Sequence, residues 1–171
     1  MSQRYNIRRA IIIPLALSLV FLFVLLLRAW LFPAFPGERI VLTAIFLLVA
    51  YLFLEVYSRQ AALGSDGMAI SKFMRSKSLG WDEITHLGSL VMGAKVYLLL
   101  TTTKGFYILS NNYERFSDLL SQLLANLQAE RIGPEISGVV ANPPQNSQPV
   151  RSAWLMAVVV MAIMALRLFV F

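Results

Sequence analysis

The chain lacks cysteine and has little charge and little histidine. Its 171 residues include no cysteine, one histidine and only 14% charged residues. Without a thiol, a disulfide framework, a thiolate nucleophile and a zinc–thiolate site are all excluded. The sequence also contains no phosphate-binding loop, no dinucleotide-binding glycine pattern, no G-x-S-x-G motif and no paired-carboxylate pattern. These absences favour a non-catalytic protein that needs no cofactor or metal.

Apolar residues are present in excess. Hydrophobic residues make up 58% of the chain and the mean hydropathy is +0.68, whereas soluble domains hold roughly 45–50% apolar residues. The net charge of +6 would suggest nucleic acid in a soluble protein. Here, however, Lys and Arg are spread thinly and much of the charge flanks the apolar segments, where it sets membrane topology. We therefore expect a membrane protein that does not bind nucleic acid.

Three apolar segments are long enough to cross a membrane. Residues 11–32 would form a helix of about 33 Å, which exceeds the roughly 30 Å hydrocarbon core of a bilayer. Residues 40–57 return across the membrane after a turn at Pro33, Pro36 and Gly37, and residues 153–171 form a third span. A cleaved signal peptide is the alternative for the first segment. The long apolar run and the lack of a convincing cleavage site favour a retained anchor.

The basic residues beside these segments predict the orientation. They precede the first span, follow the second and precede the third: Arg4, Arg8, Arg9, Arg59 and Arg151. Because Lys and Arg are enriched on the cytoplasmic side, we expect the N-terminus and the middle of the chain inside, and the C-terminus outside. The predicted location is the inner (plasma) membrane.

The expected organisation has seven parts. In order they are a cytoplasmic N-terminus (1–10), a first span (11–32), an extracytoplasmic turn (33–39), a second span (40–57), a cytoplasmic domain (61–131), a linker (132–152) and a third span (153–171). The linker is rich in Pro, Gly, Asn and Ser and extended around Pro143 and Pro144, so we expect a tether with little reason to pack.

The middle segment shows strand patterns followed by a helix pattern. Residues 68–73 partly alternate, and residues 95–103 are rich in β-branched and aromatic residues before a hairpin turn at Lys104–Gly105. A helical stripe follows an N-cap at 110–112 and ends near residues 131–133. The stripe consists of Tyr113, Phe116, Leu119, Leu120, Leu123, Leu124 and Leu127. The predicted class is α+β: a small antiparallel sheet or half-barrel capped by one amphipathic helix, joined to three transmembrane helices.

One spacing resembles a metal-binding pattern. Glu83 and His86 form an E-x-x-H sequence after Asp82, which on a helix can hold a metal. A single copy in a stretch of strand character is insufficient, so we expect a structural or surface role for these residues.

The middle segment resembles a known family. A Gly-led strand (GMAISKFMRSKSLG), the sequence WDEI at 81–84, a hairpin with a polar turn and a C-terminal helix together resemble the bacterial pleckstrin-homology-like (PH-like) domain. In that family the domain is commonly joined to transmembrane segments. The resemblance implies a small barrel of seven strands capped by a helix. Fewer strands are recognisable here, so we expect a truncated or open barrel.

The resemblance also points to candidate contact residues. In phosphoinositide-binding relatives the loop between the first two strands is basic, and Lys72, Arg75 and Lys77 have a similar spacing here. Cations beside a membrane attract anionic headgroups by about 1 kcal/mol each, and Trp81 could add an interfacial anchor. The alternative is that these cations form a solvated strand edge or set the topology.

Three functions remain open. The first is a non-catalytic, membrane-anchored PH-like interaction or scaffold protein at the inner face of the membrane. The second is an accessory subunit of a larger membrane complex, and the third is a sensor of anionic lipid headgroups. The expected partners are membrane lipids together with other membrane-protein subunits or further copies of the chain.

Overall fold

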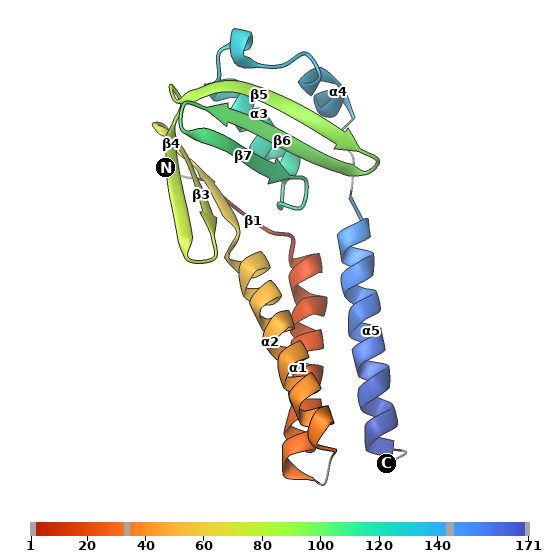
Figure 1. Cartoon of the computed structure of the whole chain (residues 1–171). Coiled ribbons are helices and arrows are strands. Elements are labelled where there is room, and N and C mark those ends of the chain that lie inside the picture. Colours follow the sequence, from red (N-terminus) through yellow and green to blue (C-terminus); the bar gives the residue numbers. More distant parts are fainter. Residues whose placement is uncertain (1–2, 33–34, 143–145, 170–171) are drawn as a thin grey trace. The chain divides into compact units, whose positions relative to one another are not determined.

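The computed structural model describes residues 3–32, 35–142 and 146–169 and has an α+β fold (Figure 1). The described residues form five α-helices, one 3-10 helix and two antiparallel sheets. The helices are α1 (Arg9–Leu31), α2 (Pro36–Ser58), α3 (Phe116–Asn126), α4 (Ile136–Ala141), α5 (Gln148–Phe169) and the 3-10 helix η1 (Ala129–Arg131). The strands are β1 (Gln3–Asn6), β2 (Gln60–Leu63), β3 (Gly67–Lys72), β4 (Arg75–Gly80), β5 (Ile84–Met92), β6 (Lys95–Thr102) and β7 (Gly105–Ser110).

The chain divides into two compact units. We call Met1–Arg8 with Ser58–Gln148 the sheet unit, and Arg9–Tyr57 with Pro149–Phe171 the helix unit. The expected boundaries of the middle domain (61–131) are therefore too narrow, because residues from before the first apolar helix and from after residue 131 pack in the same unit.

The helix unit contains three helices that are long and apolar enough to cross a membrane: Arg9–Leu31, Gly37–Ser58 and Gln148–Arg167. Pro36 opens α2, a position where the missing N–H of proline costs little, while Pro33 lies outside the described residues. Glu38 and Arg167 form an ion pair of 3.1 Å that joins the start of α2 to the end of α5. The three helices therefore alternate in direction within this unit (Figure 1).

Residues 3–6 form an edge strand of the first sheet, whose order is β1-β2-β3-β4. The prediction of a cytoplasmic segment whose arginines set the topology missed this strand. Tyr5 and Ile7 alternate with polar residues, and their side chains are only 1% and 5% exposed. The Tyr5 hydroxyl donates to Gln3 Oε1 at 2.9 Å, and the Arg115 guanidinium lies 5.5 Å from the Tyr5 ring centroid. The apolar alternation of residues 3–7 is the signal that marks this strand.

The second sheet has the order β5-β6-β7. The predicted hairpin is present, but its turn lies one residue before the predicted Lys104–Gly105: Thr102 pairs with Gly105, so Thr103 and Lys104 form a two-residue turn. Alternation along β6 is complete, with Val96, Leu98 and Leu100 fully buried. Together the two sheets hold seven strands, so the expected shortage of strands is wrong. The shortage arose because β1 lies before the apolar helices and the short β2 directly after them.

Helix α3 fills the core with the predicted stripe, since Phe116, Leu119, Leu120 and Leu123 are buried. It begins at Phe116, not at the predicted cap of residues 110–112. The Asn111 N–H donates to Val96 O at 3.0 Å and continues the sheet, and Tyr113 forms a β-bridge with Ile7. The chain therefore stays extended until the bridge to the N-terminal strand is made.

Residues 132–142 are packed, so the prediction of an unpacked linker is wrong there. Ile132 forms a parallel β-bridge with Leu87, and the Gly133 N–H donates to Leu87 O at 2.8 Å. Helix α4 then buries Ile136 and Val139. Two apolar residues spaced three apart cover one side of a short helix, which is enough to anchor it. Pro143 and Pro144 lie outside the described residues.

Candidate functional site

The three predicted cations lie together on one hairpin. Lys72 ends β3 and faces Arg75 at the start of β4, and Lys77 faces the buried Ile70. Directly opposed residues of antiparallel strands share a face, and so do alternate residues of one strand. Lys72, Arg75 and Lys77 therefore project from the same face of the sheet as the core residue Ile70. They lie beyond Ile70, at the turn end of the β3–β4 hairpin.

A groove of about 690 Å³ borders these cations and includes a residue of the other sheet. The Lys77 ammonium lies 5.4 Å from the ring centroid of Tyr107, which is on β7. The lining consists of Ile70, Lys72, Met74, Arg75, Ser76, Lys77 and Tyr107. These lining residues carry three cations and no carboxylate, so the groove attracts anionic groups. Sequence reasoning missed Tyr107, because Tyr107 and Lys77 are 30 residues apart in the sequence and meet only through the packing of the two sheets.

The hairpin tip exposes a hydrophobic residue between the cations. Met74 is 89% exposed and has a left-handed backbone with φ of 56°. A cost of roughly 1–2 kcal/mol accompanies this conformation in a residue with a Cβ. The tip thus combines an apolar side chain with flanking positive charge, which is the combination found at membrane surfaces.

Trp81 does not join this group. Its indole N–H donates to the carbonyl oxygens of Gly64 (3.2 Å) and Ser65 (3.1 Å), so its polar atom is occupied within the fold. Gly80, its neighbour, pairs with Gly67 at the other end of the hairpin from the Lys72–Arg75 pair. That separation is about 17 Å along the strand. Lys72, Arg75 and Lys77 border the turn between β3 and β4, the third and fourth strands. The expectation from the PH-like resemblance that they lie at the loop between the first two strands is therefore wrong.

The residues of the E-x-x-H spacing do not line the basic groove, although Lys77 of the groove adds to the lowering of the pKa of Glu83. Glu83 accepts a hydrogen bond from the Lys104 ammonium and another from the Gly80 N–H at 3.3 Å. The bond to Lys104 holds the pKa of Glu83 below its usual range and raises the pKa of Lys104. His86 is an exposed residue of β5, not of a helix. The described part of the chain contains no group of three metal-ligating side chains.

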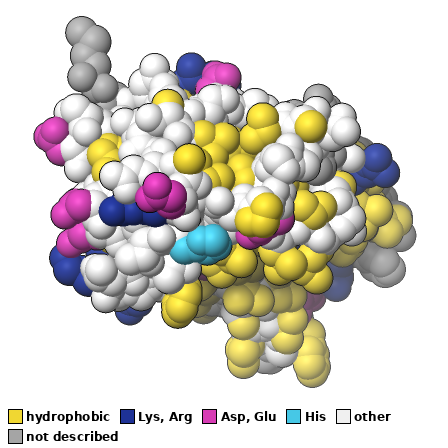
Figure 2. Space-filling view, turned by 90° about the horizontal axis from the view of Figure 1, so that it is seen from above, with side chains coloured by type: hydrophobic (Ala, Val, Ile, Leu, Met, Phe, Trp, Pro, Cys, Tyr) yellow, Lys and Arg dark blue, Asp and Glu magenta, His cyan; other side chains and the backbone are white. Residues whose placement is uncertain are grey.

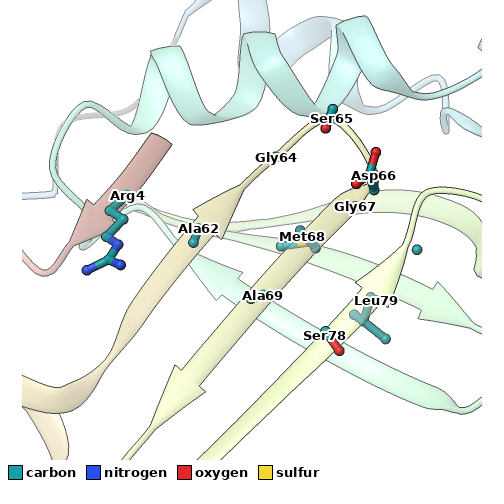
Figure 3. A pocket seen from close by; sticks show the side chains of 11 residues that line it. Arg4, Ala62, Gly64, Ser65, Asp66, Gly67, Met68, Ala69, Ser78 and Leu79 are labelled. Atoms are coloured by element: carbon teal, nitrogen blue, oxygen red, sulfur yellow. The ribbon is translucent and has the colours of Figure 1, made fainter. Parts of the chain in front are cut away.

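A second hollow, of about 490 Å³, lies over the first sheet. Its floor is a row of opposed small residues, Ala62, Ala69 and Ser78, that continues to Arg4 of β1. Figure 3 shows Arg4 at one end of this row and Ser78 at the other, with Asp66 next to Ser65 in the turn between β2 and β3. Gly67 is required here, because a Cβ at this position would lie 2.1 Å from the Leu79 carbonyl oxygen. The hollow reflects small side chains more than a constructed binding site.

The outward face of the second sheet carries an exposed apolar patch, bordered on the same face by His86, Lys95 and Thr101. Residues on this face alternate with the buried residues of β5, β6 and β7. The members of what we call the apolar face are Leu90, Met92, Tyr97, Leu99, Phe106 and Ile108. Phe106 and Ile108 are 80% and 56% exposed, and Leu90 and Met92 are also exposed. Figure 2, a view of one side of the molecule, shows that hydrophobic side chains reach the surface in patches, while most charged ones gather toward its left.

Sequence reasoning missed the apolar face. Residues 96–100 of β6 and residues 106–109 of β7 are apolar at consecutive positions, a pattern typical of strands buried on both sides. The structure covers only one side.

Comparison of the chain with family models, with curated proteins and with solved structures finds no match.

Proposed function

We propose that this chain is a multi-pass membrane protein whose sheet unit is a non-catalytic docking module at the inner face of the membrane. The observation that carries the proposal is the apolar face of the second sheet. Large exposed apolar patches on folded domains mark interaction sites, and the inward faces of both sheets of this unit already enclose a core.

The membrane part of the proposal rests on the helix unit. Its three helices meet the length and composition of membrane spans. The sheet unit is joined to them at residues 8–9, 57–58 and 148–149. If all three helices span, alternating direction places these junctions on one membrane face, and the flanking arginines favour the inner face. Such tethering raises the local concentration of the module relative to membrane-bound partners.

The PH-like resemblance remains part of this proposal. Its support is the order of four strands, three strands and a helix in the sheet unit, which agrees with the seven strands and capping helix of that family. Fold alone does not define function, so the docking role is argued from the exposed face.

Gel filtration of the full chain in mild detergent tests the docking role. We expect the native protein to elute in a complex, and the double substitution Leu90→Glu and Phe106→Glu to release it, because buried unpaired carboxylates oppose docking. Ser117→Glu, on the exposed side of α3, is the matched control and should leave the complex intact. A complex that survives the double substitution would rule out this face, and elution of the native protein as a single chain would rule out docking.

Binding of anionic lipid headgroups is a second candidate function, favoured by Lys72, Arg75 and Lys77 around one groove. Because the chain has no cysteine, Met74→Cys can carry a single environment-sensitive dye in nanodiscs. Anionic lipid should shift its emission to the blue relative to zwitterionic lipid, and added salt should weaken the shift. Glutamine at the three cationic positions should remove the shift. An equal signal in both lipids would exclude this function.

A further inference from the structure

The β5–β6 hairpin ends in residues 90–95, which we call the apolar tip. Met92 pairs with Lys95, so the turn between them has two residues. The three residues before this turn, Leu90, Val91 and Met92, are 48%, 49% and 61% exposed. They project from both faces of β5, because neighbouring residues of a strand point to opposite sides. The core therefore ends before the tip, and the tip presents apolar side chains in two directions.

Hydrogen bonds within the sheet unit link the apolar tip to two of the junctions with the helix unit. The Asn111 side chain donates to the Ala94 carbonyl oxygen, in the turn, at 2.9 Å. The next residue, Asn112, accepts from the Arg8 N–H at 3.0 Å and, through its side-chain oxygen, from Asn146 Nδ2 at 3.4 Å. Arg8 directly precedes α1, and Asn146 lies two residues before α5. Two adjacent asparagines thus connect the tip to the residues that lead into α1 and α5.

If α1 and α5 span the membrane, these links bring the apolar tip to the lipid headgroups. Helix α1 has 23 residues and is about 34 Å long, against roughly 30 Å for the hydrocarbon core. Arg8 therefore lies in the headgroup layer, which is roughly 5–7 Å thick on each side. Because a chain extends by about 3.3 Å per residue, Met92 lies within about 7 Å of Ala94. The apolar side chains of the tip can thus reach the boundary between headgroups and acyl chains.

The charge of the second sheet suits an anionic membrane surface. Residues 84–113, which include β5, β6 and β7, contain two lysines, one histidine and no carboxylate. Lys95 lies on the apolar tip itself, whereas Glu83 and Glu135 bond to this sheet outside the tip. Apolar side chains beside cations are the combination that binds the interface of membranes with anionic lipids. Together with the position of the tip, this charge favours a lipid surface over a protein as the occupant.

We propose that the apolar tip inserts into the lipid surface of the inner leaflet, with its three apolar side chains among the upper acyl chains and Lys95 at the headgroups. This inference rests on the membrane part of the proposed function. It assigns one end of the apolar face to lipid. The other end stays available to a docking partner, because Phe106 pairs with Thr101, about 20 Å along β6 from Lys95.

Spin labelling of the full chain in nanodiscs of phosphatidylcholine and phosphatidylglycerol tests the insertion of the tip, because the native chain has no cysteine. A nitroxide is attached at Met92→Cys. Its collisions with oxygen, which concentrates in lipid, are compared with its collisions with a nickel chelate, which stays in water. We expect Met92→Cys to favour oxygen and Thr103→Cys to favour the chelate. Thr103 is an exposed residue just beyond the other end of β6, about 27 Å along the strand from Lys95.

A third label separates failure of the tip from failure of the membrane spans. Leu48→Cys, in the middle of α2, should favour oxygen more strongly than Met92→Cys. If Leu48→Cys favours oxygen while Met92→Cys favours the chelate, the insertion is overturned and the spans stand. If Leu48→Cys favours the chelate, the spans and the insertion fail together. Low collision rates of Met92→Cys with both reagents would show that a protein covers the tip, which also overturns the insertion.

A charge placed in the apolar tip gives a second measurement. Val91→Asp, combined with the label at Met92→Cys, should make the label favour the chelate, because a carboxylate opposes entry into acyl chains. Val91→Ala is the matched control and should keep the preference for oxygen. Equal preferences of the label in these two variants would contradict the insertion.

Discussion

Removal of the Tyr5 side chain should destabilise the whole sheet unit. Tyr5 lies on β1, is 1% exposed and packs under Arg115 at the start of α3. A buried aromatic side chain removes about 150–250 Å² from water, and at about 25 cal/mol per Å² this corresponds to roughly 4–6 kcal/mol of transfer free energy. Substitution of buried aromatic residues by alanine costs about 3–5 kcal/mol. We therefore expect Tyr5→Ala to lower the free energy of unfolding of the sheet unit by about 3–4 kcal/mol.

Tryptophan fluorescence can follow this unit alone. Trp81 is the one tryptophan of the sheet unit, and replacing Trp30 and Trp154 of the helix unit by phenylalanine isolates its signal. A loss of 3 kcal/mol should lower the melting temperature of a unit of this size by about 12–24 °C. Asn6→Ala, an exposed neighbour on the same strand, is the control and should change stability by less than about 0.5 kcal/mol. Equal melting temperatures for the two variants would refute the assignment of β1 to the sheet.

Four other substitutions test particular contacts. Arg131 donates to the carbonyl oxygens of Trp81, Asp82 and Ile84, so Arg131→Ala should cost about 1–3 kcal/mol in denaturant unfolding, unlike a merely exposed arginine. Gly67→Ala should cost more than about 1 kcal/mol, since its Cβ would strike the Leu79 carbonyl; an unchanged midpoint would contradict this close approach. Met74→Gly should raise stability by about 1 kcal/mol by relieving the positive φ, and a loss of stability would contradict the strain. Glu83→Gln should lower the stability of the native chain most at neutral pH. Lys104 lowers the pKa of Glu83, and a carboxyl group whose pKa is lowered by folding contributes its full stability only at pH values above its pKa in the unfolded chain. The difference should vanish as the pH falls through that lowered pKa, and a difference independent of pH would argue against the pair.

The sequence predicts the local elements of this fold better than their partners. The apolar runs predict three membrane-length helices, the stripe from Phe116 to Leu123 predicts α3, and the runs around Lys104 predict the β6–β7 hairpin. Each of these signals lies within one short stretch. Strand β1 is four residues long and is separated from β2 by two long helices, so its pairing is a long-range effect that no local pattern contains. The short helix α4 was hidden for a related reason, since its Pro- and Gly-rich surroundings are typical of a linker.

The candidate site was predicted in part. The spacing of Lys72, Arg75 and Lys77 is sufficient to place them on one hairpin once β3 and β4 pair. Their common face and the contact with Tyr107 depend on register and on the meeting of two sheets. Trp81 lies far from these cations because it follows the open end of the β3–β4 hairpin, whereas Lys72 and Arg75 lie at its turn. The apolar face was missed because consecutive apolar residues, as in 96–100 and 106–109, do not indicate which side of a strand remains uncovered.

Photo-crosslinking from the apolar face in intact membranes tests the central claim, docking through this face, most directly. A benzophenone side chain at position 106, on the exposed edge strand, is compared with one at position 117, on the exposed side of α3. The account predicts one defined adduct from position 106 and none from position 117. No adduct from position 106, or the same adducts from both positions, would contradict docking through this face.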